Sequence, residues 1–327
     1  MSGAVVHAVH ENPEWFGVFA EQFEAQGVPY REWLLTGGDL DLSEEPPPGV
    51  YWSRFSASSH TRGHEHAKEH SRAVLAWAAA SGRRVVNGAG VLSFEVSKVL
   101  QLSALRAHGL EVPHTRVVVG TEHLVAAARA FPTPFLTKHN QGGKGLGVRR
   151  YDSADELAAD IAEGTYPEPV DGVTLLQEYV PPADGTITRV EIVGGEVIYA
   201  ISGDTARGGF QLCPADACAI DPDTGRPVKP YGATIEVDPT QPIFSLRPEL
   251  PAGLAEAYLS FTAAHGIEIA GIEFLEAADG RLLTYDVNTN TNYNPAVETV
   301  APRSGPGSIV SFLGGLLAEE SKGEQAA

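Results

Sequence analysis

Residues 138–148 form the densest group in the sequence that could bind an anion. Lys138 ends a strand-like segment, so its ammonium could neutralise an inner phosphate. Four glycines follow within six positions, and glycine lets a backbone turn tightly and approach an anion with its N–H groups. The spacing fits neither a Walker loop nor a dinucleotide-binding fingerprint. Taken alone, the segment is equally well interpreted as a glycine-rich hairpin turn. The glycines are Gly142, Gly143, Gly145 and Gly147.

Three oxygen-bearing side chains lie on two apolar segments that turn at Asp279-Gly280. Glu273 precedes the turn, and Asp286 and Asn288 follow it. Because Asp286 and Asn288 are two positions apart, their side chains share one face of a strand. Two carboxylates held together in apolar surroundings need a cation, and oxygen ligands of this kind suit Mg²⁺. The pattern therefore favours a magnesium site over a solvated acidic hairpin.

The segment Leu175–Val180 has two interpretations. It is an apolar strand that includes Glu178 and is followed by Pro181-Pro182, which is typical of an edge strand. The same residues could form a hinge whose backbone and carboxylate contact the amino edge of adenine. From this segment alone we favour the edge strand.

The segment from Arg54 to His64 combines hydroxyl groups with basic side chains. Arg54 ends a strand-like segment, and His60 and Arg62 follow, so the loop could clamp a substrate carboxylate. A solvated loop that caps the helix expected over Glu65–Ser81 explains the same residues equally well.

The elements that must position these residues begin with an alternation of strands and helices in the first hundred residues. This alternation predicts a small parallel sheet with helices on its faces. The expected strands are Ala4–Val9, Tyr30–Leu35, Val50–Phe55 and Arg84–Asn87, and the expected helices are Pro13–Gln26, Glu65–Ser81 and Phe94–His108.

From Pro113 onward the pattern changes to paired strands with shorter helices, and one of the pairs turns at Gly194-Gly195. The expected strands are Arg116–Val119, Phe135–Lys138, Val148–Tyr151, Leu175–Val180, Thr188–Val193, Glu196–Ile201, Ile269–Glu276 and Leu282–Val287. The expected helices are Glu122–Ala130, Ala154–Glu163, Pro251–His265 and Ser308–Ala318, and a polar tail follows from Glu319.

The composition limits the classes of partner. The formal net charge is −19 over 327 residues, which argues against a nucleic acid and against an anionic membrane surface, since both attract clustered Lys and Arg. No apolar run approaches the roughly 20 residues that cross a bilayer, and the first ten residues lack a charged leader. With two cysteines, Cys213 and Cys218, we expect no disulfide framework and a cytoplasmic protein. The sequence leaves open whether the chain forms a homo-oligomer.

In this order and spacing, the glycine-rich segment, the Glu178 segment and the acidic hairpin resemble the ATP-grasp superfamily. The similarity is greatest to carboxylate–amine ligases related to ribosomal-protein glutamate ligases, and more distant to D-alanine–D-alanine ligases. It extends from Phe94 to Asn288 and includes Lys98, whose counterpart in the family contacts the nucleotide phosphates.

The resemblance implies a fold of mixed α/β and α+β type, in which two α+β subdomains sandwich ATP. It divides the chain into an N-terminal α/β domain (1–92), a central subdomain with the glycine-rich loop (93–182), a C-terminal subdomain with the metal site (183–319) and a disordered tail (320–327).

The resemblance also implies roles for individual residues. The expected ATP-binding residues are Lys98, Lys138, Gly142, Gly143, Lys144, Gly145, Gly147, Gln177, Glu178, Tyr179 and Val180, with Asp184 as a substitute for the ribose-binding acid of relatives, which falls on Ile187. The expected magnesium ligands are Glu273, Asp286 and Asn288. The expected catalytic residues are Lys138, Arg189 and Arg207, and the expected substrate-binding residues are Arg54, His60, Arg62 and Asn290.

Two departures from the family concern the acceptor side of the site. The basic residues expected after the first hairpin are replaced by Asp204 and Gln211, with Arg207 as the nearest cation. After Asn288 the chain reads TNTNYNP, where relatives often have a Pro-Gly turn.

The activity that the resemblance implies is ATP- and Mg²⁺-dependent joining of a carboxylate to an amine through an acylphosphate. We expect small-molecule carboxylate and amine substrates or a peptide, with amino acids favoured. Two alternatives stay open: an ATP-binding module without ligase activity, motivated by Asp204 and Gln211, and a phosphotransferase that stops at the phosphorylated product.

Overall fold

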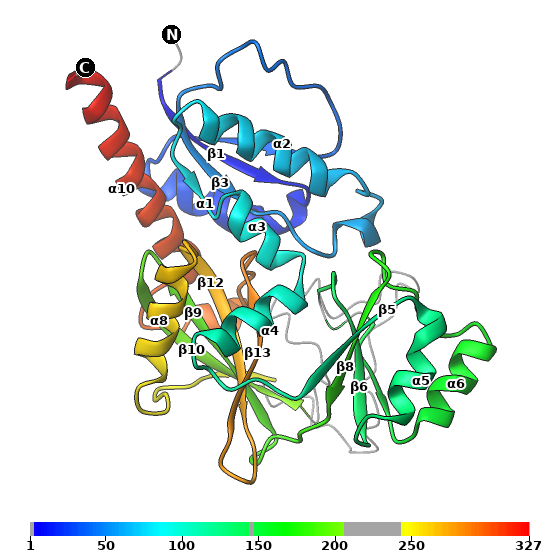
Figure 1. The fold of residues 1–327 in the computed structure, drawn as a ribbon. Coiled ribbons are helices and arrows are strands. Elements are labelled where there is room, and N and C mark those ends of the chain that lie inside the picture. The colour runs from blue at the N-terminus through cyan, green and yellow to red at the C-terminus, as the bar shows by residue number, and fades with distance from the viewer. Residues whose placement is uncertain (1–2, 144, 146, 206–242, 327) are drawn as a thin grey trace.

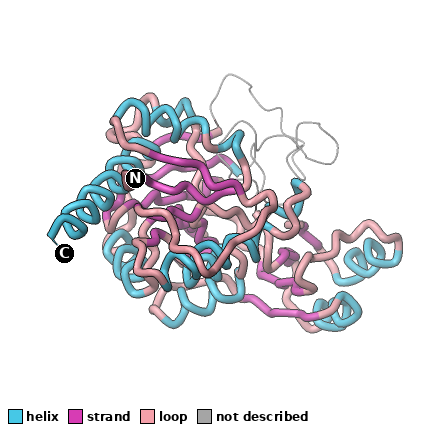
Figure 2. The backbone as a smooth tube through the Cα atoms, turned by 90° about the horizontal axis from the view of Figure 1, so that it is seen from above, coloured by secondary structure: helices cyan, strands magenta, loops and turns pink. Residues whose placement is uncertain are grey.

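The computed structural model describes residues 3–143, 145, 147–205 and 243–326. These residues form three β-sheets, each built from its own stretch of the chain, with helices packed around them (Figure 1). A view from above shows the helices around the outside of the strands (Figure 2). Of the helices described, none has the length and apolar character needed to span a membrane.

The N-terminal sheet is parallel, with strand order β2-β1-β3-β4, as the alternating pattern predicts. Its central strands are buried on both faces, which explains their nearly continuous apolar sequences. The strands are β1 (Val5–His10), β2 (Tyr30–Leu34), β3 (Gly49–Ser53) and β4 (Val85–Val86), and the helices are η1 (Pro13–Trp15), α1 (Gly17–Gln26), η2 (Ser59–Arg62) and α2 (Ala67–Ala80).

The helix expected over Phe94–His108 is in fact two helices, α3 (Ala89–Glu95) and α4 (Lys98–Ala107). Ser97 has an extended backbone and its hydroxyl accepts a hydrogen bond from the Leu100 N–H, so it caps a new helix. The correction matters for function because it places Lys98 in the first turn of α4, whose backbone N–H groups bond to Asn140 and Ser97.

The central sheet is antiparallel, with strand order β5-β8-β6-β7. Phe135 and Leu176 pack beneath α5 and α6 on one face, so alternation along β6 places Lys138 on the other face. The strands are β5 (Thr115–Val119), β6 (Phe135–His139), β7 (Arg149–Tyr151) and β8 (Val173–Glu178), and the helices are η3 (Thr121–His123), α5 (Leu124–Arg129) and α6 (Ala154–Ala162).

The C-terminal sheet is antiparallel, with strand order β11-β10-β9-β12-β13. One face packs against α3, α4 and α8 through a core that includes Tyr258, Phe261 and Phe274. The strands are β9 (Thr186–Val193), β10 (Glu196–Asp204), β11 (Phe244–Leu246), β12 (Ile269–Glu276) and β13 (Leu282–Asn288), and the helices are α8 (Leu254–Ala264) and α9 (Pro295–Glu298).

The last helix, α10 (Gly305–Ala326), returns to the N-terminal domain and lies beside α1 and β3 (Figure 1). Ile309 and Leu313 share one core with Phe19 and Trp52. The tail at 320–327, which we expect from the sequence to be disordered, instead continues this helix as far as Ala326. Its Glu, Lys, Gln and Ala residues are good helix formers, and the packed first turns supply the nucleus.

Gly49 provides a test of the N-terminal packing. Its φ is +130°, and a Cβ added there would lie 1.9 Å from the carbonyl oxygen of Val5. We expect Gly49→Ala to lower the free energy of unfolding in urea by more than about 2 kcal/mol, because backbone must move to relieve the overlap. Gly27→Ala is the matched control: φ is +64° with no atom within 4 Å, so only backbone strain of about 1 kcal/mol applies. Equal losses in the two variants would contradict this packing.

Candidate functional site

The structure brings Glu273, Asp286 and Asn288 together on adjacent strands. Glu273 of β12 is directly opposite Asp286 of β13, and Asn288 donates a hydrogen bond to the Glu273 carboxylate over 3.0 Å. Glu273 is buried; this burial, together with the Asp286 charge, raises its pKa to about 7. In the described part of the chain no three His, Cys, Asp or Glu residues form a metal cluster. Two carboxylates and one amide oxygen nevertheless suit Mg²⁺, which commonly takes its other ligands from water and phosphate.

Two lysines from other elements reach this pair of carboxylates. Lys98, in the first turn of α4, places Nζ 2.5 Å from Oδ1 of Asp286. Lys138 of β6 is buried, with Nζ 5.0 Å from the centre of the Tyr285 ring. Burial, and then the Lys98 charge, lower the pKa of Lys138 to about 8, against the opposing effect of Asp286 and Glu273. Cations from α4 and β6 thus converge on carboxylates of the β12–β13 hairpin.

A buried ion pair adjoins the carboxylates on β9. Arg189 is opposite Glu273, with 3.6 Å between Nη1 and Oε1, and its Nε donates to Glu191 over 2.7 Å. Glu191 is 1% exposed, and burial raises its pKa. Among the described residues, Nη2 of Arg189 and Oε2 of Glu191 have no hydrogen-bond partner. Gly271 makes this arrangement possible, since a Cβ there would lie 2.2 Å from Nε of Arg189.

Glu191 is a site residue that the sequence analysis missed. The signal was present, because Glu191 is two positions from Arg189 and therefore shares its face of the strand. A carboxylate in a strand that is buried along nearly its whole length is uncommon without a partner or a function.

The glycine-rich segment connects β6 to β7, and hydrogen bonds attach its first residues to the start of α4. Asn140 accepts hydrogen bonds from the Val99 N–H and the Ser97 hydroxyl through its side chain, which ties the base of the loop to the start of α4. Gly147 has φ +73°, and a Cβ there would lie 2.6 Å from the ring of His139, so the position requires glycine. Gly145 also has a left-handed backbone, with φ +70°. Gly142 and Gly143 are described, whereas Lys144 lies outside the described residues.

The edge-strand interpretation of Leu175–Val180 is wrong. Residues 175–178 of this segment belong to β8, which is an inner strand between β5 and β6. The carboxylate of Glu178 accepts hydrogen bonds from the His114 backbone N–H over 2.8 Å and from Arg281 over 3.1 Å. The Glu178 side chain is therefore bonded within the protein, and the backbone after it remains the better candidate for contact with adenine.

The other residues expected near adenine and ribose have protein partners too. Gln177 is buried and donates to the Thr115 hydroxyl. The Tyr179 ring lies 4.5 Å from the guanidinium carbon of Arg150. Asp184 accepts from the N–H and hydroxyl of Thr186, which stabilises the turn into β9. Val180 is the second residue after the end of β8.

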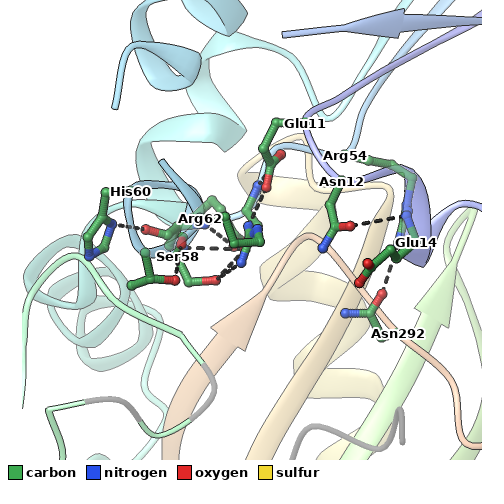
Figure 3. A network of polar contacts seen from close by, with 12 residues as sticks. Glu11, Asn12, Glu14, Arg54, Ser58, His60, Arg62 and Asn292 are labelled. Carbon is green, nitrogen blue, oxygen red and sulfur yellow. Dashed lines mark hydrogen bonds and ion pairs between the residues drawn. The ribbon is translucent and has the colours of Figure 1, made fainter. Parts of the chain in front are cut away.

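The polar loop after β3 is folded into the protein, which overturns its interpretation as a solvated loop. Arg54 is 3% exposed and donates hydrogen bonds to the backbone oxygens of Trp15 and Thr291 and to the side chain of Asn292 (Figure 3). Its guanidinium also lies 4.2 Å from the ring centre of Phe19. Arg54 thus joins the N-terminal domain to the segment after β13, a structural arrangement rather than that of a solvent-facing clamp for substrate.

Arg62, in the same polar loop, has a partly exposed side chain. It donates to Ser58 over 2.9 Å and to the buried carboxylate of Glu11 over 2.5 Å (Figure 3). His60 bonds through Nδ1 to the Ala57 backbone oxygen. A Cβ on Gly143 would lie 3.7 Å from Oγ of Ser58, so this loop and the glycine-rich loop are neighbours.

Two further side chains, the half-buried Glu95 and the buried Gln101, hold these parts together, and neither was predicted from the sequence. Glu95 accepts from the Ala57 N–H with one oxygen and from the N–H and hydroxyl of Thr289 with the other. Gln101 of α4 donates to the Val287 carbonyl and accepts from the Val287 N–H, on either side of which lie Asp286 and Asn288. The side-chain oxygen of Asn290 is buried without a hydrogen-bond partner in the described part of the chain, and Arg207 lies outside it.

The role of Arg54 can be tested by removing its donors. We expect Arg54→Met to lower the free energy of unfolding by about 2–4 kcal/mol, because buried carbonyl oxygens lose their partners. Urea denaturation followed by circular dichroism measures this change. Arg72→Met removes the same charge from an exposed ion pair with Glu69 and should leave the midpoint nearly unchanged. Similar stability of the two variants would show that Arg54 does not join the domains.

No protein-family model matches the sequence. A curated protein of Parasynechococcus marenigrum (strain WH8102), named "Probable alpha-L-glutamate ligase", is 23% identical over 244 residues. The match covers 74% of this chain, but the chain spans only 44% of the length of that relative.

Solved structures match over nearly the whole chain. A RimK domain protein ATP-grasp from Sphaerobacter thermophilus DSM 20745 has a TM-score of 0.65 and 17% identity, covering 94% of this chain and 99% of that chain. The ATP-grasp ligase PsnB, in complex with a minimal precursor, Mg and ADP, has a TM-score of 0.63 and 16% identity, covering 96% and 98%. The three sheets described above agree with the expectation from the sequence: the chain has the ATP-grasp fold.

Proposed function

We propose that the protein is an ATP- and Mg²⁺-dependent ligase that joins a carboxylate to an amine through an acylphosphate. The observation that carries the proposal is the meeting of Lys98 and Lys138 with the facing carboxylates Glu273 and Asp286. Lysines suit phosphates and the carboxylates suit a divalent ion, so together they suit a metal–nucleotide complex. The names of the similar proteins support the same activity.

In the proposed reaction, a carboxylate oxygen of the substrate attacks the γ-phosphorus of ATP, and the bond to the bridging oxygen breaks to release ADP. The amine nitrogen then attacks the acyl carbon, phosphate leaves with its C–O bond electrons, and the nitrogen loses a proton. Glu273, Asp286 and Asn288 would hold magnesium, which neutralises phosphate charge. Lys98 and Lys138 hold the phosphates, and Arg189 offers its unpartnered Nη2 beside Glu273.

The remaining roles are part of the same proposal. The loop containing Gly142, Gly143, Gly145 and Gly147 closes over the phosphates and limits hydrolysis of the acylphosphate. Arg62, His60 and Asn290 lie on the segments where the N-terminal domain approaches the end of β13, which makes them candidates for contact with an amino acid or peptide. Lys144 and Arg207 stay predictions from the sequence.

The ligase proposal predicts the outcome of two assays, one that traps the acyl intermediate and one that measures ADP and phosphate. With ATP, Mg²⁺ and a panel of amino acids as carboxylates, hydroxylamine should trap the acyl intermediate as a hydroxamate, and an accepted amine should release phosphate and ADP in equal amounts. Asp286→Asn should reduce ADP formation at least 100-fold, because it removes a charge that holds the metal. Circular dichroism of this variant checks that it folds.

The outcomes separate the alternatives. Nucleotide binding without ADP formation under every mixture would favour a binding module. ADP formation with a stable phosphorylated product and no phosphate release on addition of amines would favour a phosphotransferase.

The lowered pKa of Lys138 predicts that nucleotide binding depends on pH. Its pKa in the nucleotide-free protein is about 8, so the ammonium is lost as pH rises through this value, whereas phosphates favour the charged form. We expect ADP affinity to fall above about pH 8 and binding at pH 8 to take up protons, which calorimetry in buffers of different ionisation enthalpy detects. Lys138→Arg keeps the charge and should flatten the profile. An unchanged profile in that variant would exclude Lys138 as its source.

A further inference from the structure

Asp286 is bonded to a cation of the protein itself in this structure. Nζ of Lys98 lies 2.5 Å from Oδ1, and the two side chains are 13% and 19% exposed. One oxygen of a proposed magnesium ligand is thus held by the ammonium proposed to bind phosphate. The ammonium and a metal ion therefore compete for the Asp286 carboxylate in this arrangement.

Helix α4 is fixed on both sides of Lys98, so the side chain is the part that can move. The Lys98 N–H donates to the carbonyl oxygen of Asn140, and Ser97 bonds to the Asn140 side chain. One turn later, the buried amide of Gln101 bonds to both backbone groups of Val287. These contacts keep the helix in register with β13 and keep Lys98 within reach of Asp286, while the flexible four-carbon stem of Lys98 allows its ammonium to turn towards another anion.

The charges around the carboxylates also oppose a metal ion that arrives alone. Lys98, Lys138 and Arg189 carry three positive charges beside the carboxylates of Glu95, Glu191, Glu273 and Asp286, and burial favours the neutral form of the first three of these. A divalent cation would enter a site whose negative charge is already largely balanced by ammonium and guanidinium groups of the protein. Nucleotide phosphates change this balance, because they add negative charge and give Lys98 a second partner.

We propose that Lys98 occupies Asp286 until a nucleotide arrives, so that the divalent ion binds with the nucleotide and not before it. The inference rests on the proposed nucleotide and metal site, but not on the ligase chemistry. Lys98 therefore has two partners in sequence: a carboxylate in the empty site and a phosphate in the filled one.

Mn²⁺ titration followed by electron paramagnetic resonance tests the proposal without turnover. Without nucleotide, the wild type should bind Mn²⁺ weakly at the site and Lys98→Met at least ten-fold more tightly, because Asp286 is released. Lys68→Met is the matched control: it removes a lysine charge near the glycine-rich loop whose partner is the amide oxygen of Gln141, and it should behave as the wild type. Lys98→Gln provides a second neutral variant if Lys98→Met does not fold.

Each outcome decides the inference. Tight Mn²⁺ binding by Lys98→Met that is lost in the Lys98→Met, Asp286→Asn double variant supports it. Wild-type binding of Mn²⁺ alone as tight as binding with ADP overturns it, as does an unchanged affinity in Lys98→Met and Lys98→Gln. No Mn²⁺ binding by any variant even with ADP overturns both this inference and the proposed metal site. A protein that shows the expected Mn²⁺ behaviour but forms no amide leaves the inference supported and the ligase proposal refuted.

Discussion

The apposition of Glu273 and Asp286 on neighbouring strands is the constraint around which the site is organised. Facing carboxylates in a buried setting repel one another, and this repulsion contributes to the raised pKa of Glu273. The surrounding structure supplies positive charge from three directions: Lys98 from a helix, Lys138 from the central sheet and Arg189 from the adjacent strand. The negative charges of the site are therefore balanced by positive charges from elements far apart in the sequence.

Helix α4 holds several of these charged groups in position relative to one another. It contacts the base of the glycine-rich loop through Asn140 and strand β13 through Gln101. A rigid element that touches both the loop and the strand fixes the distance between the groups proposed to hold phosphate and those proposed to hold metal. Catalysis by positioning requires this kind of support, because small displacements of reacting groups are costly.

The sequence predicted the parts whose signals are local. The glycine run, the alternation of the β12–β13 hairpin and the βαβ pattern of the N-terminal domain each depend on neighbouring residues, and the structure has these elements close to the expected bounds. The break at Ser97 was missed because apolar periodicity continues across it, whereas a cap depends on one backbone conformation. The position of β8 was wrong because strand order in a sheet is set by long-range pairing, which a single segment does not encode.

The roles of the polar residues that support the site could not be predicted from neighbouring positions, for a different reason. Glu95 and Gln101 bond to residues more than 180 positions away, so their roles depend on the completed fold. Arg54 illustrates the opposite error: its chemistry suggested a ligand for carboxylates, but its position uses the same donors to join two domains. Residue type indicated what these groups could bind, while the fold decided which partner each one met.

The return of α10 to the N-terminal domain has a consequence for biosynthesis. The core around Phe19 and Trp52 is completed by Ile309 and Leu313, so one wall of the first domain consists of residues that are translated almost three hundred positions later. During synthesis, this apolar surface of the N-terminal sheet stays uncovered while the rest of the chain emerges from the ribosome. Nascent chains of this protein should therefore depend on protection of that surface, by chaperones or by the ribosome, until residues 305–317 can dock.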